Sequence, residues 1–356
     1  RRPVDSPARL YRLGMGLFYR FRCGAGSRRR GISRLPALSH NHPITESNMH
    51  NDIHLTMATW DYDHVRDLAT GMVKPKGIEL THLQMEVEEI FYRFAKSFEW
   101  DVSELSFAKY CSIMSQDNPP ITGIPVFISR VFRHSAFYIR SDGSIKQSTD
   151  LKGKRIGIPE WSQTATVYAR GWLHHQGGVK LDEVEWVQAG VNAPGRVEMA
   201  KLNLPAGVKY TQVADKSLAE MLLSGEIDCM ISAHPPHEFE NGGMTRLMPD
   251  FREVEESYFE ETGIYPIMHT VAIKRDVYEE YPWIARNLMT AFEEARDRSV
   301  ERLTSVTASQ IPVPWGYVNA EKTASKIFGD NGVWPYGIEP SRTTIEAFLQ
   351  YCDEQG

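Results

Sequence analysis

The chain has 356 residues, of which 42% are hydrophobic and 24% are charged. This length suggests about two domains, and the composition excludes collagen-like and largely disordered proteins. The net charge of −6 is unevenly distributed, because residues 1–48 hold ten arginines and two acidic residues, whereas the rest holds 30 basic and 44 acidic residues. An acidic body argues against a general nucleic-acid surface, so we expect no nucleic-acid partner.

Residues 1–48 form a basic extension that lacks the features of an export signal. The apolar stretch at residues 10–21 is interrupted by two arginines, and residues 35–44 contain two prolines and two histidines. A secretory or twin-arginine signal needs an unbroken apolar core in such a place, whereas an organellar transit peptide fits the arginine-rich composition. We interpret the segment as a disordered extension, translated from upstream of the natural start, and expect the fold to begin near Met49.

Cysteine usage and hydropathy favour a cytoplasmic location. The four cysteines are Cys23, Cys111, Cys229 and Cys352. They lack the close pairs of a zinc site and the density of a disulfide scaffold, which is typical of reduced thiols. No stretch approaches the roughly 18 apolar residues of a membrane span. We therefore expect a soluble cytoplasmic protein without a membrane partner, and a homo-oligomer is compatible with these features.

From Met49 onward, strand and helix patterns alternate, which is typical of an α/β protein. The first predicted unit has strands at 53–58, 78–85 and 101–107 and helices at 61–71 and 88–98, followed by strands at 126–130 and 136–139. The second has strands at 155–158, 183–187 and 227–232 and helices at 162–174 and 216–223, the last ended by Gly225. A strand at 269–273 and a helix starting at Pro282 follow, the helix having an apolar stripe formed by Ile284, Leu288, Ala291, Phe292 and Ala295.

The two similar units predict two lobes that enclose a ligand cleft. We assign residues 1–48 to the extension, residues 49–140 and about 266–356 to lobe 1, and about 141–265 to lobe 2. In open parallel sheets, ligands bind outside the carboxyl ends of the strands. This rule places three segments at the cleft, namely Glu104 to Lys109, which includes Ser106 and Phe107, Pro159 to Thr166, and Ala233 to His237.

Cationic side chains cluster in an apolar segment, FISRVFRHSAFYI at residues 127–139. If this segment is a strand, Arg130 and His134 share one face and Arg133 takes the other. Buried guanidinium groups need anionic partners, and their forked shape matches a carboxylate. Each arginine alone fits a structural salt bridge as well as a ligand site, but three such groups within five residues favour an anion site.

A second candidate for anion binding is the helix start at residues 162–164. The sequence LKGKRIGIPEWSQTAT at residues 151–166 lacks the spacing of a nucleotide-binding loop. The backbone N–H groups of Ser162, Gln163 and Thr164 are expected at the first turn, where they can hold a carboxylate. Arg170, about two turns further on among apolar residues, is either an anion ligand or a solvated helix charge.

Two further histidines stand where strands end or pass through the core. His234 begins the segment HPPHE, in which two prolines prevent the helix that would present both imidazoles to one metal ion, so we prefer a residue that lines the cleft. His269 lies in an apolar strand, and such residues are more often satisfied core histidines than catalysts. From the residues alone, the chain is a two-lobed α/β protein that binds an anion.

Several blocks of the sequence resemble the 4,5-dihydroxyphthalate decarboxylase family, a branch of the type 2 periplasmic-binding-protein fold. They occur in the same order across residue 50 to the C-terminus and are DVSELSFAKY at 101–110, FISRVFRHSAFYI at 127–139, DLKGKRIGIPEWSQTATVYARGWL at 150–173, TGIYPIMHTVAIKRDV at 262–277, FGDNGVWPYGI at 328–338 and YCDEQG at 351–356. The resemblance implies a non-oxidative decarboxylation in phthalate degradation, from 4,5-dihydroxyphthalate to 3,4-dihydroxybenzoate and CO2.

That reaction suggests roles for the candidate residues. Arg130, Arg133 and the helix start would bind the dicarboxylate. His134, His234 and His269 are candidate proton donors, and Glu104 is expected to polarise a phenol or orient a histidine. Trp161 and Phe107 are expected to form an apolar wall that disfavours the departing carboxylate. The sequence requires no cofactor, and a divalent metal chelated by the two phenol oxygens is compatible with these side chains.

A second class of function shares the same fold. A non-catalytic solute-binding protein for an aromatic or other carboxylate would use a similar cleft, but it normally must be exported. The order of the blocks and the lack of an export signal favour the decarboxylase.

Overall fold

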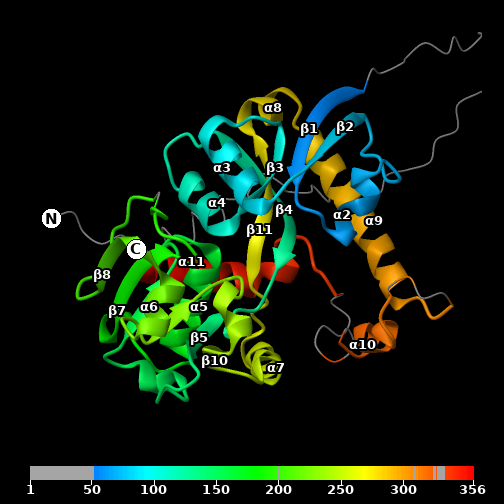
Figure 1. The fold of residues 1–356 in the computed structure, drawn as a ribbon. Coiled ribbons are helices and arrows are strands. Elements are labelled where there is room, and N and C mark those ends of the chain that lie inside the picture. Colours follow the sequence, from blue (N-terminus) through cyan, green and yellow to red (C-terminus); the bar gives the residue numbers. More distant parts are fainter. Residues whose placement is uncertain (1–51, 199, 308–309, 311, 324–325, 327–332) are drawn as a thin grey trace, which may run out of the picture.

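The computed structural model describes residues 52–356 except 199, 308–309, 311, 324–325 and 327–332, and it contains two β-sheets with helices packed around them (Figure 1). This arrangement confirms the predicted α/β class. The predicted basic extension at residues 1–48 lies outside the described residues. In the described part of the chain, every helix is too short or too polar to cross a membrane.

The first sheet has five strands in the order β2-β1-β3-β11-β4. The strands are β1 (Ile53–Thr59), β2 (Ile78–Gln84), β3 (Val102–Ser106), β4 (Ile121–Arg130) and β11 (Ile267–Lys274). β1 runs parallel to β2 and β3, whereas β11 runs antiparallel to β3 and β4. Its helices are α2 (Asp63–Ala69), α3 (Val87–Ser97), α4 (Phe107–Met114), α8 (Arg275–Glu280) and α9 (Ile284–Thr304). The chain therefore leaves the first sheet after β4, forms the second sheet, and comes back through β11, which pairs between β3 and β4.

The second sheet has six strands in the order β10-β5-β9-β6-β7-β8. The strands are β5 (Phe137–Arg140), β6 (Arg155–Ile158), β7 (Glu185–Gly190), β8 (Lys209–Ser217), β9 (Cys229–Ile231) and β10 (Met244–Arg246). The helices that follow strands of this sheet are α5 (Thr164–His175), α6 (Leu218–Ser224) and α7 (Phe251–Thr262), and α10 (Gly316–Thr323) and α11 (Arg342–Gln355) come later in the chain. Strands β8 and β10 and helices α4, α7, α8, α10 and α11 are absent from the sequence prediction.

Local patterns account for the elements that the sequence predicts correctly. All five residues of the predicted apolar stripe of α9 are buried in one cluster with β1, β4 and β11. Helix α6 begins with a capping box between Ser217 and Glu220, and it ends at Gly225, whose φ of 79° suits a glycine. These signals are short-range, so they can be recognised without the tertiary structure.

An apolar cluster is shared between the two sheets, and α11 contributes to it. Phe348 of α11 lies with its ring centroid 4.9 Å from that of Phe107 in α4 and 4.8 Å from that of Tyr168 in α5. In Figure 1, α11 is the red helix between the two sheets. The sequence assigns this C-terminal segment to lobe 1, and the structure shows it in contact with helices of both sheets. A shared apolar core restricts independent motion of the two halves.

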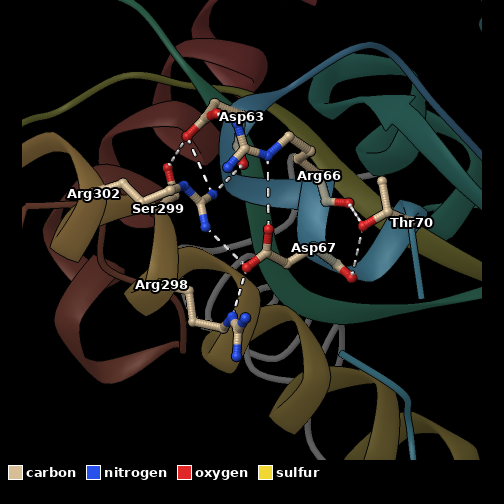
Figure 2. A network of polar contacts seen from close by, with 7 residues as sticks. All are labelled: Asp63, Arg66, Asp67, Thr70, Arg298, Ser299 and Arg302. Atoms are coloured by element: carbon tan, nitrogen blue, oxygen red, sulfur yellow. Dashed lines mark hydrogen bonds and ion pairs between the residues drawn. The ribbon is translucent and has the colours of Figure 1, made fainter. Parts of the chain in front are cut away.

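Helices α2 and α9 are joined by a polar network around Asp67 (Figure 2). The Asp67 carboxylate accepts hydrogen bonds from Arg298 Nε at 2.5 Å and from Arg302 Nη1 at 2.9 Å. Asp67 is buried, and burial raises its pKa, but the hydrogen bonds from the two arginines outweigh burial and hold the pKa below its usual value. The network therefore stabilises the folded state while Asp67 is ionised.

We expect Asp67→Asn to lower the free energy of unfolding at pH 7 by about 2 kcal/mol, because a charged acceptor is lost from a buried position. Since the folded-state pKa is depressed, this stabilisation is present above the unfolded pKa of about 4 and is lost as pH falls through the folded value. The difference between wild type and variant should therefore shrink below about pH 4, as measured by urea unfolding. Asp63→Asn, at a mostly exposed position of the same helix, is the matched control and should cost less than about 1 kcal/mol. An equal loss in both variants, or one independent of pH, would contradict this account.

Candidate functional site

A buried carboxylate, a histidine and a tyrosine from three separate segments meet in the first sheet. Glu104 is fully buried, and its Oε1 lies 2.6 Å from His269 Nδ1 and 2.6 Å from the Tyr62 hydroxyl. Its other oxygen accepts the backbone N–H of Trp60 at 2.8 Å. We call Tyr62, Glu104 and His269 the carboxylate cluster.

The sheet register brings these residues together. His269 of β11 lies opposite Ser106 of β3, and Glu104 lies opposite Val271. Residues two apart on a strand face the same side, so Glu104 and His269 are diagonal neighbours within reach of each other. Tyr62 follows the carboxyl end of β1, the strand parallel to β3. The cluster therefore forms where ligand sites are expected in such sheets.

Hydrogen-bonding roles follow from these contacts. Burial and the neighbouring Glu104 charge raise the pKa of Tyr62, so its hydroxyl stays protonated and donates to the carboxylate. Glu104 accepts from three groups, and we therefore assign the proton on this side of His269 to Nδ1. The side chain of His269 keeps 17% exposure, and its ring meets that of Phe91 edge to face at 4.8 Å. The Nε2 side of the ring is then the part that can exchange a proton with a ligand.

Arg133 contacts residues of both halves of the protein. Its Nε contacts the sulfur of Met268 in β11 at 3.1 Å, and its Nη1 donates to the carbonyl of Ala233, after β9, at 3.3 Å. Burial lowers the pKa of Arg133 to about 10, and the charge of Glu255 works in the opposite direction. Because that pKa is well above 7, the half-buried group is a cation at neutral pH.

Within the part of the chain that the structure describes, Arg130 donates to neutral groups and not to the anionic partner that the sequence suggests. Its guanidinium donates to the carbonyls of Tyr265 and Pro335 and to the hydroxyl of Ser341, at 2.9, 2.9 and 2.7 Å. The strands predicted at 126–130 and 136–139 are confirmed as separate, because β4 ends at Arg130, a 3₁₀ turn begins at His134 and β5 begins at Phe137. The alternation of faces that one continuous strand would impose therefore does not apply here, and Arg130 joins the C-terminal segment to β4.

His134 pairs with an acid that the sequence does not single out. The side chain of His134 is 3% exposed, and its Nδ1 lies 3.8 Å from Oε1 of Glu255 in α7. Aromatic rings of Trp172 and Tyr258 flank it at 5.0 and 4.9 Å. This pair lies in the packing between α5 and α7, apart from the Glu104 hydrogen bonds.

The helix start at Ser162 already holds a carboxylate from the chain itself. Ser162 donates its backbone N–H and its hydroxyl to Glu198 at 3.1 and 2.6 Å. The Thr164 hydroxyl contacts that of Ser106 at 2.8 Å and accepts the backbone N–H of Ala108 at 2.9 Å. The expectation of an open N–H group thus needs correction for Ser162, whereas the two segments predicted at the cleft do meet here.

Three other predicted ligand contacts lie in the core. Trp161 is 2% exposed and Phe107 is fully buried, so neither forms an open apolar wall. Arg170 is fully buried too, with its guanidinium 3.8 Å from the centre of the Trp161 ring and hydrogen bonds to the Gln355 side chain and the Trp161 carbonyl at 2.8 and 2.7 Å. Burial lowers the pKa of Arg170 to about 9. These contacts tie α5 to the end of α11.

The remaining predicted residues take different positions. Gln163 caps the start of α5 and accepts the Thr166 hydroxyl at 3.0 Å. His234 is exposed after β9, and its carbonyl accepts the Ser232 hydroxyl at 2.6 Å.

Tyr62 is the member of the carboxylate cluster that the sequence analysis missed. Its position just beyond the carboxyl end of β1 was the signal that could have identified it.

A divalent metal was compatible with the sequence, and the described residues offer one place for it. Within residues 52–356, outside the undescribed gaps, a single group of three His, Cys, Asp or Glu side chains lies close enough to share an ion. It consists of His174, His175 and Glu354, not of the carboxylate cluster. Among the described residues, Glu104 belongs to no group of three such ligand atoms close enough to share an ion.

Comparison with known proteins places the chain in a class and then in a family. Residues 113–301 match the family described as NMT1/THI5 like, and together with the two sheets this match defines an α/β protein of the type 2 periplasmic-binding-protein fold. The periplasmic aliphatic sulphonate binding protein SsuA of Escherichia coli aligns with 85% of this chain and 84% of its own, at 10% identity and a TM-score of 0.44. A likeness at that level says nothing about function.

Sequence relatives identify the family. The chain is 32% identical to the 4,5-dihydroxyphthalate decarboxylase of Comamonas testosteroni over 85% of its own length and 92% of the relative. It is 38% identical to that of Pseudomonas putida over 54% of its own length and 75% of the relative. The chain belongs to the 4,5-dihydroxyphthalate decarboxylase family.

Proposed function

We propose that this protein is a non-oxidative decarboxylase of a hydroxylated aromatic dicarboxylate, with 4,5-dihydroxyphthalate as substrate and 3,4-dihydroxybenzoate and CO2 as products. The observation that carries the proposal is the carboxylate cluster, in which a buried Glu104 orients His269 through a contact of 2.6 Å with Nδ1. A family of decarboxylases supplies the reaction class. The side chains supply a proton donor and an anion-binding group.

Proton transfer to the ring is the step assigned to His269. His269 takes part as the doubly protonated imidazolium, so the ring carbon that carries the departing carboxylate takes the proton from Nε2, a C–H bond forms, and the neutral imidazole ring keeps the Nδ1–H that Glu104 holds. The hydroxyl para to that carbon donates electron density and stabilises the protonated ring. The C–C bond to the carboxylate then breaks, its electron pair returns to the ring, and CO2 leaves. Solvent returns the proton to His269, so atoms and electrons balance without a redox cofactor.

Arg133 is proposed to hold the carboxylate that remains on the product. Its Nε contacts the sulfur of Met268, the residue before His269 in β11, and its Nη1 donates to the carbonyl of Ala233, in a segment predicted at the cleft. A guanidinium that is partly removed from water binds a carboxylate more strongly than an exposed one. Glu104, by holding Nδ1–H, sets which nitrogen of His269 faces the substrate. Tyr62 donates to the same oxygen of Glu104, Oε1, and helps to hold the carboxylate in place.

Incubating the purified protein with 4,5-dihydroxyphthalate tests the proposal. Chromatography should show 3,4-dihydroxybenzoate forming with one equivalent of CO2, both with and without EDTA. Phthalate, which lacks the para hydroxyl, is the matched control and should not turn over. Tight binding of 4,5-dihydroxyphthalate without turnover, even with divalent metal added, would favour the solute-binding alternative and overturn the enzyme.

A further inference from the structure

The end of α5 and the end of α11 bring together three metal-ligand side chains. His174 and His175 are the last two residues of α5, and Glu354 lies in the last turn of α11. One ligand atom from each lies within 4.8 Å of the others. Nε2 of His175 is 2.7 Å from Oε2 of Glu354.

We propose that His174, His175 and Glu354 form a binding site for one divalent transition-metal ion, with Zn²⁺ as the best-matched ion. Two imidazoles and one carboxylate are a common ligand set for zinc, and a fourth position remains for water. Ligand atoms around a tetrahedral zinc ion lie about 3.3 Å apart, given bond lengths of about 2.0–2.1 Å. Binding of the ion would lengthen the present contact of 2.7 Å between His175 Nε2 and Glu354 Oε2, and the three ligand atoms already lie within 4.8 Å of one another.

The surroundings favour a cation over a simple hydrogen bond. Nδ1 of His174 is buried and has no hydrogen-bond partner among the described residues. A buried polar atom without a partner is costly, and coordination of an ion through Nδ1 would offset that cost. The site also lies at the C-terminus of a twelve-residue helix, where the carbonyl ends of the peptide dipoles attract positive charge.

The position of the site indicates a structural role for the ion. Thr164, which contacts Ser106, is at the other end of α5, about 16 Å away at 1.5 Å per residue. An ion at His175 is therefore remote from the start of α5. The ion would connect α5 to α11, the helix whose Phe348 and Tyr351 pack in the apolar core shared by both sheets. Binding to the folded state alone stabilises it by mass action.

Metal titration of the untagged full-length protein tests this proposal. After EDTA treatment, ZnCl₂ should raise the Tm, and further EDTA should reverse the rise. Co²⁺ should give the visible absorption of a tetrahedral ion, and wild type should bind one equivalent of Co²⁺ more than the variant His174→Gln. The difference between the two proteins is the number to compare, because the chain has 12 histidines in all and others can bind Co²⁺ too.

A second variant, Glu354→Gln, and a control separate the site from general metal binding. Glutamine has the size of glutamate but not its charge, so Glu354→Gln should weaken Zn²⁺ binding at least about tenfold. Even the loss of a hydrogen-bond partner of a metal ligand typically lowers metal affinity 10–100-fold. His237→Gln, at an exposed position outside the group, should behave as wild type. Circular dichroism verifies that each variant folds without metal. No Zn²⁺-dependent rise in Tm, or the same rise in wild type and in Glu354→Gln, would overturn the proposal.

Discussion

His269→Gln should lower kcat for 4,5-dihydroxyphthalate by about a thousandfold, within the range that general acid catalysis supplies. Glutamine keeps a polar side chain beside Glu104 but cannot deliver a proton to the ring carbon. Substrate binding should change little, so KM should stay within a few-fold of wild type. Steady-state kinetics with chromatographic detection of 3,4-dihydroxybenzoate measures both quantities.

Two comparisons show whether the loss comes from proton transfer. Tyr62→Phe keeps the contact between His269 and Glu104 and removes one hydrogen bond, so it should cost only about tenfold in kcat. His54→Gln changes an exposed histidine that contacts Thr81 in the neighbouring strand and should have no effect. A folded His269→Gln variant with kcat within threefold of wild type would exclude His269 as the donor.

Arg133→Ala should lower kcat/KM by about a hundredfold, because a charge-assisted hydrogen bond to the substrate carboxylate is lost. Arg133→Lys keeps the charge without the forked geometry and should recover part of that loss. Initial rates across substrate concentrations, with binding measured by calorimetry, separate KM from kcat.

Arg130 provides the matched comparison for Arg133. Its guanidinium is held by two carbonyls and a hydroxyl, so Arg130→Lys should lower Tm and leave the KM of the folded fraction near wild type. The opposite outcome, a wild-type kcat/KM in Arg133→Ala together with a large rise of KM in Arg130→Lys, would exchange the roles of the two residues. Wild-type kinetics in both variants would show that neither arginine binds the substrate carboxylate.

Local signals were sufficient to predict most of the secondary structure. The alternation of apolar residues indicates β1, β2 and β6, and the stripe from Ile284 to Ala295 indicates α9. Strand β8 was missed because most of its residues are exposed or half-buried, so its sequence lacks a buried face. Helix α7 was missed for a similar reason, since only Tyr258 of its twelve residues is buried. Elements at an edge of a sheet or on the surface have weaker hydrophobic patterns, because fewer of their side chains are buried.

The candidate site was only partly predictable. Glu104 and His269 were singled out separately, but their contact joins positions 165 residues apart and depends on the pairing of β3 with β11. The three arginines looked equivalent in the sequence. Their surroundings separate them, because Arg130 and Arg170 donate to neutral groups, which include Ser341 and Gln355 of the C-terminal segment. Arg133 instead contacts Met268 in β11 and the carbonyl of Ala233 after β9.

Composition, periodicity and ordered blocks of residues determined the α/β class, most elements and the family, because these depend on neighbouring positions or on the order of residues in the chain. The tertiary structure alone decided which charges are already satisfied. Ser162 holds the Glu198 carboxylate, and the Arg130 partner Ser341 is 211 residues away. Whether a buried cation is available to a ligand depends on such distant partners, since a buried polar group is stabilised by whichever acceptor the fold places beside it.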